Sequence, residues 1–111
     1  MLHKTELHNG IDIAAAKGTG VAAVKSGVVT RVRTSATYGE VVEYRTADGY
    51  DVMYAHLSEI LVQEGEEIKQ GQIIAKSGDT GLVTGPHLHY SVWKEGQLLD
   101  PLPFVTRGAL L

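Results

Sequence analysis

The sequence predicts an all-β domain, built as a compact antiparallel β-sheet or barrel-sandwich. Turn-forming residues, such as Ser26-Gly27, Tyr38-Gly39 and Ser77-Gly78, recur about every 8–12 positions along the chain. The runs between these turns are short and rich in β-branched residues, which favour strands. No segment has a convincing 3.6-residue period, so at most a turn or two of helix is expected.

Length and composition indicate one domain of ordinary character. The chain has 111 residues, of which 43% are hydrophobic and 21% charged, and its net charge is −3. This mild acidity speaks against nucleic acid or an anionic membrane as a partner. The absence of cysteine excludes disulfides and thiolate metal sites. No apolar run approaches the roughly 18 residues of a membrane helix, so no membrane insertion by this segment is expected.

The N-terminus lacks the basic and then apolar pattern of a signal peptide. A candidate functional residue nevertheless appears as early as His8. We therefore expect residues 1–111 to be a single domain excised from a longer exported or membrane-anchored protein, with the targeting segment upstream.

The first clear strand covers residues 27–33, where alternation from residue 28 assigns Val28, Thr30 and Val32 to one side. A hairpin follows, because residues 40–46 and 50–56 flank the turn pair Asp48-Gly49. In the second strand of this hairpin, alternation assigns four residues to one face: Tyr50, Val52, Tyr54 and His56.

Two further extended pieces are expected within residues 62–75, around Gly65 and Gly71, before a last strand near the C-terminal end. In that last strand, alternation directs Leu88, Tyr90 and Val92 to the core. The histidines His87 and His89 then share the opposite face, with Cα atoms about 6.5–7 Å apart.

The strand histidines are the first candidate site. Two imidazoles side by side on a rigid strand, after a loop rich in glycine and proline, suit a metal ion. Two solvated strand histidines would have the same pattern, so the interpretation depends on partners elsewhere in the chain. The glycines of the preceding loop, Gly78, Gly81 and Gly85, are interpreted as shaping a groove.

A second candidate lies upstream, where His8 and Asp12 are four positions apart. The intervening Gly10 and Ile11 favour an irregular or extended segment, in which glycine lets the backbone direct both side chains to one point. A chance His and Asp in a surface loop is the alternative.

Together the candidates form a coherent set. A catalytic zinc takes three protein ligands from His and carboxylates and leaves a fourth position to water. His8, Asp12 and one of His87 and His89 would supply these ligands. His56 and the remaining strand histidine would then hold the attacking water and stabilise the oxyanion.

Three motifs in order resemble the signature motifs of the lysostaphin/LytM-type zinc metallopeptidases, bacterial enzymes that cut peptide bonds in peptidoglycan. They are His8-x-x-x-Asp12, Tyr54-Ala55-His56-Leu57 and Gly85-Pro86-His87-Leu88-His89. Connecting phrases such as Gly71-Gln72-Ile73-Ile74 and Gly78-Asp79-Thr80-Gly81 are also similar, and the resemblance covers residues 8–105.

The resemblance implies one Zn²⁺ per chain, held by His8, Asp12 and His89, with His56 and His87 as the catalytic histidines. It implies a compact antiparallel β-fold with the metal in a groove. The expected activity is a zinc metalloendopeptidase that hydrolyses peptide cross-links of peptidoglycan, outside the cytoplasm in the cell wall, periplasm or intermembrane space. One departure is Tyr90-Ser91, where the family commonly has an aromatic residue followed by Glu, so a contact around the ligands is expected to differ.

Two other functions fit parts of the pattern. Some domains of this kind have lost catalysis and dock to a partner protein, as activators of wall hydrolases or in sporulation channels of the stage II sporulation protein Q type. The complete set of ligands and catalytic histidines favours an enzyme. A biotinyl- or phosphotransfer-carrier barrel would suit residues 27–29 and 62–74, but it leaves His8 and Asp12 unexplained.

Overall fold

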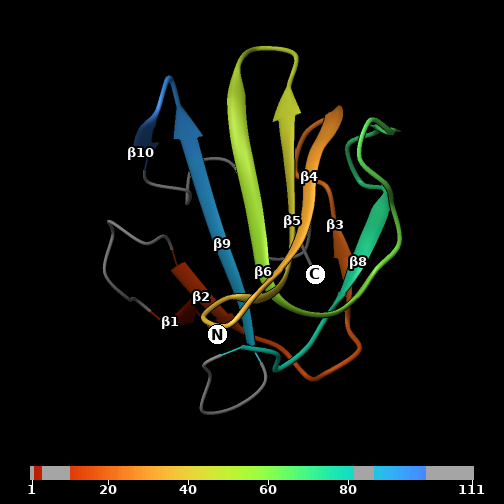
Figure 1. Cartoon of the computed structure of the whole chain (residues 1–111), viewed down its shortest axis with the longest axis vertical. Coiled ribbons are helices and arrows are strands. Elements are labelled where there is room, and N and C mark those ends of the chain that lie inside the picture. The colour runs from red at the N-terminus through yellow and green to blue at the C-terminus, as the bar shows by residue number, and fades with distance from the viewer. Residues whose placement is uncertain (1, 4–10, 82–86, 100–111) are drawn as a thin grey trace.

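The computed structural model describes residues 2–3, 11–81 and 87–99, with the backbone alone at positions 2, 3, 11, 12, 14 and 87. The described part is all-β and contains no helix, which confirms the predicted fold class (Figure 1). Its strands are β1 (Leu2–His3), β2 (Ile11–Ala14), β3 (Gly20–Ala22), β4 (Gly27–Ser35), β5 (Gly39–Thr46), β6 (Tyr50–Ile60), β7 (Glu67–Ile68), β8 (Ile73–Ser77), β9 (His87–Lys94) and β10 (Gln97–Leu99).

The strands form one curled antiparallel sheet. Its main path runs β1-β2-β9-β6-β5-β4-β7, and β10 pairs with β9. The long strand β6 pairs with β5 and β9 along its first half, then leaves them and pairs with β8, which in turn pairs with β3 (Figure 1). The central strands β9, β6, β5 and β4 therefore carry two extended faces.

The predicted hairpin around Asp48-Gly49 joins β5 and β6. The amide of Gly49 donates to the carbonyl of Thr46 at 3.1 Å, and the φ of +90° at Gly49 requires the conformational freedom of glycine. The sequence prediction of this element is confirmed.

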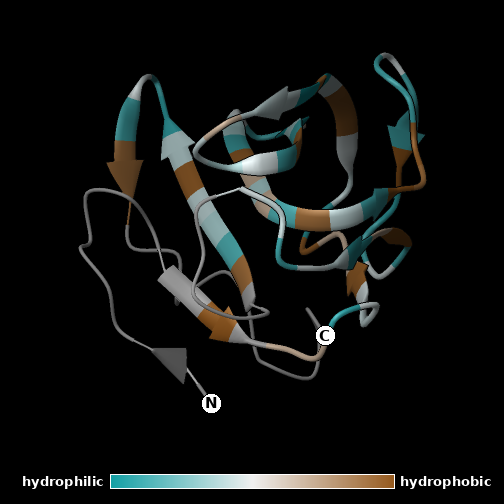
Figure 2. Cartoon of the chain, turned by 60° about the horizontal axis from the view of Figure 1, so that its bottom comes forward, coloured by the Kyte–Doolittle hydropathy of each residue, from teal (hydrophilic) through white to brown (hydrophobic). Residues whose placement is uncertain are grey.

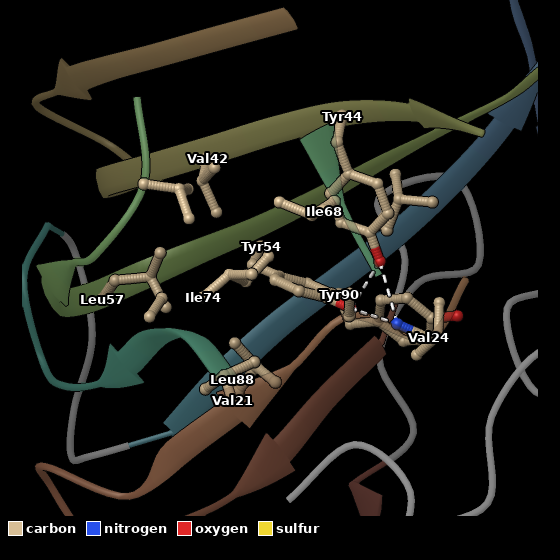
Figure 3. Close-up of a cluster of buried hydrophobic side chains, with 14 of the residues drawn as sticks. Val21, Val24, Val42, Tyr44, Tyr54, Leu57, Ile68, Ile74, Leu88 and Tyr90 are labelled. Atoms are coloured by element: carbon tan, nitrogen blue, oxygen red, sulfur yellow. Dashed lines mark hydrogen bonds between the residues drawn. The ribbon is translucent and has the colours of Figure 1, made fainter. Parts of the chain in front are cut away.

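One face of the central strands packs into the hydrophobic core (Figure 3). Leu88, Tyr90 and Val92 of β9 are fully buried there, as their alternation predicts. Figure 2 shows the underlying pattern, with hydrophobic and polar residues alternating along the strands. β3 and β8 contribute Val21 and Ile74 to the same core.

Two tyrosine hydroxyl groups form hydrogen bonds inside this core. The hydroxyls of Tyr44 and Tyr54 are 2.7 Å apart, and Tyr54 donates to the carbonyl of Ala22 at 2.9 Å. The amide of Val24 donates to both hydroxyls, at 3.1 and 3.2 Å. These contacts tie the segment after β3 to the central strands.

The predicted alternation of residues 27–33, with Val28, Thr30 and Val32 on one side, does not hold along the whole strand. Val29 is buried, whereas Val28 is 42% exposed. The register shifts between Val29 and Arg31, where Val29 pairs with Tyr44 and Arg31 with Glu43. This β-bulge at Thr30 moves Arg31 to the face opposite the core, and strict two-residue periodicity cannot anticipate it.

A second bulge corrects the expectation that His56 shares a face with Tyr54. Val42 pairs with Tyr54 and Glu40 with Leu57, so Ala55 and His56 together oppose the single residue Val41. His56 has a φ of +61°, unusual for a residue other than glycine. The extra residue turns His56 away from the core and lets Leu57 return to it, fully buried.

Candidate active site on the open face of the sheet

The face of β4, β5, β6 and β9 opposite the tyrosine core carries the candidate catalytic residue His56 and the candidate zinc ligand His89, and we call it the site face. The rings of His56 and His89 lie there with centroids 6.1 Å apart and planes at 80°. The Tyr38 ring lies 5.5 Å from His89 and 6.1 Å from His56. Two strands and the turn between β4 and β5 therefore bring three rings together.

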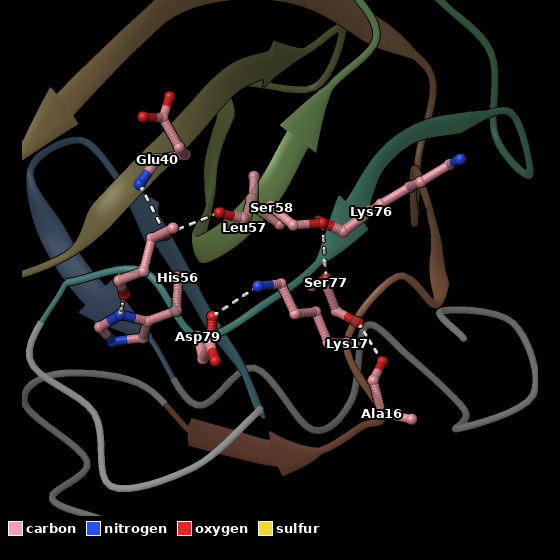
Figure 4. A network of polar contacts seen from close by, with 10 residues as sticks. Ala16, Lys17, Glu40, His56, Leu57, Ser58, Lys76, Ser77 and Asp79 are labelled. Carbon is pink, nitrogen blue, oxygen red and sulfur yellow. Dashed lines mark hydrogen bonds and ion pairs between the residues drawn. The ribbon is translucent and has the colours of Figure 1, made fainter.

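His56 is held in one orientation. Its Nδ1 lies 2.7 Å from the carbonyl oxygen of Thr80 (Figure 4). A carbonyl only accepts hydrogen bonds, so Nδ1 carries the proton and, in the neutral ring, Nε2 carries the lone pair. The backbone amide of His56 donates to the carbonyl of Tyr38 at 2.7 Å, which stabilises the left-handed backbone conformation. The side chain is buried, at 5% exposure.

Thr80, which accepts from His56, is itself fixed. Its hydroxyl donates to the carbonyl of Leu57 at 2.6 Å and accepts from the amide of Glu40 at 3.1 Å. A Cβ added at Gly39 would lie 2.3 Å from the Thr80 hydroxyl, so the loop approaches this closely only because position 39 is glycine. Gly81 packs equally closely against the same turn.

The segment from β8 to Thr80 is anchored by further polar contacts (Figure 4). The Ser77 hydroxyl donates to the carbonyl of Ala16 at 2.9 Å, and the Ser58 hydroxyl donates to the carbonyl of Ser77 at 2.9 Å. Lys17 and Asp79 form an exposed ion pair at 3.4 Å. These contacts connect the segment to β6 and to the chain after β2, so the position of the Thr80 carbonyl is well defined.

His89 has a different partner. Its Nε2 lies 3.0 Å from the hydroxyl of Ser91, two residues along β9, and both side chains are buried. Ser91 stands where the resembled family commonly has Glu, and the expectation that a contact around the ligands differs stays a prediction. The β2–β9 register pairs Asp12 directly with His89 and Ala14 with His87.

The structure thus brings together His56 and His89, two of the five predicted site residues. Asp12 and His87 are placed by their backbones only, and His8 lies outside the described residues. Among the side chains that the structure describes, no group of three His, Cys, Asp or Glu could hold a metal ion. The assignment of His8, Asp12 and His89 as ligands therefore stays a prediction.

Sequence reasoning missed Tyr38 and Thr80. Tyr38-Gly39 was interpretable only as a turn, and Thr80 only as part of a glycine-containing connecting phrase. The contact of Gly39 with Thr80 joins the two regions across about 40 residues, and no local pattern signals such a contact. No helix suited to crossing a bilayer is found in the described residues.

Comparison with known proteins reveals extensive similarity. The family model "Peptidase family M23" matches residues 6–101. The DD-carboxypeptidase/endopeptidase Mpg of Neisseria meningitidis serogroup B (strain MC58) is 43% identical over 102 residues, which are 92% of this chain and 24% of that protein. The peptidoglycan DD-endopeptidase ShyA of Vibrio cholerae is 43% identical over 95 residues, 86% of this chain and 22% of ShyA.

Stage II sporulation protein Q of Bacillus subtilis is also a relative, 37% identical over 105 residues, which are 91% of this chain and 37% of that protein. Across the curated relatives compared, the chain spans between 20% and 37% of their length.

Solved structures share the fold. The structure of LytU has a TM-score of 0.82 and 40% identity, and the match covers 87% of this chain and 71% of LytU. A zinc-containing peptidase from Vibrio cholerae has a TM-score of 0.81 and 39% identity, with 84% of this chain and 29% of that chain covered.

Proposed function

Because the chain belongs to peptidase family M23, we propose that it is a zinc-dependent endopeptidase that hydrolyses the peptide cross-links of bacterial peptidoglycan. The observation that carries the proposal is the pair of oriented imidazoles, His56 and His89, on the site face beside Tyr38. The relative ShyA, a peptidoglycan DD-endopeptidase, supports the substrate.

His8, Asp12 and His89 would hold one zinc ion. The backbone register supports this set, since directly opposed positions of an antiparallel pair, here Asp12 and His89, share one face of the sheet. Because Ser91 contacts Nε2 of His89, ligation would be through Nδ1. Two imidazoles and a carboxylate are ligands that suit zinc. When bound, zinc lowers the pKa of water toward neutrality and polarises a carbonyl.

His56 and His87 would carry the proton transfer and stabilise the developing oxyanion. The Thr80 carbonyl fixes the proton of His56 on Nδ1, so Nε2 is the nitrogen that takes a proton from the attacking water. Because His56 is held by Thr80, Tyr38 and the bulge, its ring needs little reorganisation during the reaction.

The main alternative is a catalytically weak or silent module that docks to a partner protein. The relationship to stage II sporulation protein Q supports this alternative, as does the solved complex titled as the SpoIIQ–SpoIIIAH pore-forming complex, 37% identical with a TM-score of 0.80. The fixed tautomer of His56 favours catalysis, because a docking surface does not require one.

We further propose that the chain is one domain of a longer protein and acts outside the cytoplasm. Its coverage of between 20% and 37% of curated relatives supports the first point. The second follows from the proposed substrate, because peptidoglycan lies in the cell wall or periplasm.

Zinc stoichiometry tests the proposed ligands. Elemental analysis of the purified chain should give one zinc, and His89→Ala should lose it. His56→Ala is the matched control, because His56 lies on the same face and is equally buried, at 5% exposure. It should keep the zinc. Full zinc in His89→Ala, or none in the parent chain supplied with zinc, would refute the ligand set.

A further inference from the structure

An open pocket of about 470 Å³ lies on the site face. This volume is in the range of binding sites for small ligands. Three arginines and two carboxylates line it together with apolar side chains. The charged lining residues are Arg31, Arg33, Glu43, Arg45 and Asp51.

Tyr38 links the pocket to the candidate active site. Tyr38 lines the pocket, and its ring centroid lies 5.5 Å from that of His89. Trp93 lines the pocket as well, four residues beyond His89 on β9, which corresponds to about 13 Å along a strand. An extended peptide bound at the histidines and running along β9 would therefore reach Trp93 within about four residues.

The charges of the pocket do not balance. Arg33 pairs with Glu43, with Nε and Oε2 3.0 Å apart, and Arg45 pairs with Asp51 at 2.8 Å. Arg31 makes no ion pair within the part of the chain that the structure describes. Three arginines against two carboxylates leave one positive charge in the pocket, although the chain as a whole has a net charge of −3.

We propose that this pocket binds a carboxylate of the peptide substrate, with Arg31 as its anchor. The inference rests on the proposed function and specifies its substrate class. A guanidinium binds a carboxylate through two parallel hydrogen bonds. Glu43, the cross-strand neighbour of Arg31, forms its ion pair with Arg33 instead. Met53 and Trp93 supply apolar surface for the aliphatic part of the bound residue. The chain therefore prefers cross-links that bear a free carboxylate over uncharged oligoglycine.

Trp93 allows a direct test, because it is the single tryptophan of the chain. Its fluorescence is followed while two synthetic peptides are titrated into zinc-loaded protein carrying His56→Ala, which slows hydrolysis during the titration. The peptides are identical except that one has a side-chain carboxylate and the other the corresponding carboxamide. We expect the carboxylate peptide to bind at least about tenfold more tightly, as for a hydrogen-bonded ion pair. The preference should weaken as salt is added.

Substitutions assign the preference to one residue. Arg31→Gln should reduce the affinity ratio of the two peptides to about one, and Arg31→Lys should retain part of it because the charge remains. The control is Lys69→Gln, which removes an exposed cation outside the pocket and should leave the ratio unchanged.

Equal affinity for the two peptides, equal weakening of both by Arg31→Gln, or no fluorescence response to either peptide would overturn the pocket assignment. The assay does not require hydrolysis. A chain that discriminates between the peptides but cleaves neither with His56 intact would contradict the proposed function alone. A chain that cleaves both and binds them equally would contradict the pocket alone.

Discussion

The two faces of strands β5, β6 and β9 satisfy their polar groups in different ways. On the core face, the hydroxyls of Tyr44 and Tyr54 form hydrogen bonds with each other and with the backbone, and both residues are fully buried. On the site face, His56 and His89 are each oriented by one neighbouring oxygen, from Thr80 and Ser91. The same strands therefore contribute to the hydrophobic core on one face and to the candidate site on the other.

The consequence for the core tyrosines is that their neutral form is strongly favoured. Burial raises the pKa of Tyr44 to about 12, although hydrogen bonds from Tyr54 and the Val24 backbone lower it. Burial likewise raises the pKa of Tyr54 well above its ordinary value. Substitutions on the two faces should therefore have separable effects, on stability for one face and on turnover for the other.

The largest effect is expected on the site face. His56→Ala should lower the rate of peptidoglycan hydrolysis by roughly 10²–10⁴, the range for loss of a general base or oxyanion donor. The melting temperature should fall little, because the variant leaves the hydrophobic core intact. Initial rates at equal zinc content, with thermal unfolding of both proteins, measure the two effects. A variant that retains the parent rate would mean that His56 is not catalytic.

The next largest effect concerns the core face. Leu88, between His87 and His89 on β9, is fully buried, so Leu88→Ala should destabilise the fold by about 2–5 kcal/mol. Urea unfolding gives this free energy. Ile73→Ala is the control at a position that is 50% exposed, and it should cost much less. Activity per folded molecule should not change in either variant, and a loss in Leu88→Ala would show that the two faces are coupled.

A smaller effect should appear at alkaline pH. The raised pKa of Tyr44 means that the folded state keeps a proton that the unfolded state loses above pH 10. This contribution to stability is complete below pH 10 and is lost as the pH rises toward 12, by up to about 1.4 kcal/mol per pH unit. Urea unfolding between pH 9 and 11 should show a shallower decline for Tyr44→Phe than for the parent chain. Identical slopes would contradict the linkage.

The smallest effect is expected at Tyr90. Its hydroxyl is buried and has no hydrogen-bond partner in the described structure. Tyr90→Phe should therefore be neutral or stabilise the fold by up to about 1 kcal/mol. Tyr54→Phe, which removes a partnered hydroxyl from the same core, should instead destabilise it by about 1–3 kcal/mol. Equal losses in urea unfolding of the two variants would refute this distinction.

The sequence predicts the strands well because their signals are local. The Asp48-Gly49 turn and the alternation of Leu88, Tyr90 and Val92 each lie within a few residues, and the structure confirms both. The bulges at Thr30 and at Ala55-His56 were not predictable, since a bulge depends on how two strands pair and leaves no two-residue pattern.

The prediction of the site is limited in the same way, because its geometry also depends on contacts between distant segments. His56 and His89 could be selected from their motifs, and they do lie together. The face on which His56 lies could not be predicted, because the bulge reverses the alternation. Thr80 and Tyr38 were missed because their contacts with His56 join segments that are distant in the sequence.

We propose that the site face is a zinc peptidase centre. The most direct measurement is the release of new amino groups from purified peptidoglycan by the zinc-loaded chain, before and after removal of zinc with a chelator. We predict steady release, its loss with the chelator and its return when zinc is added back. Release that is insensitive to zinc, or none from a chain that holds one zinc, would contradict the account.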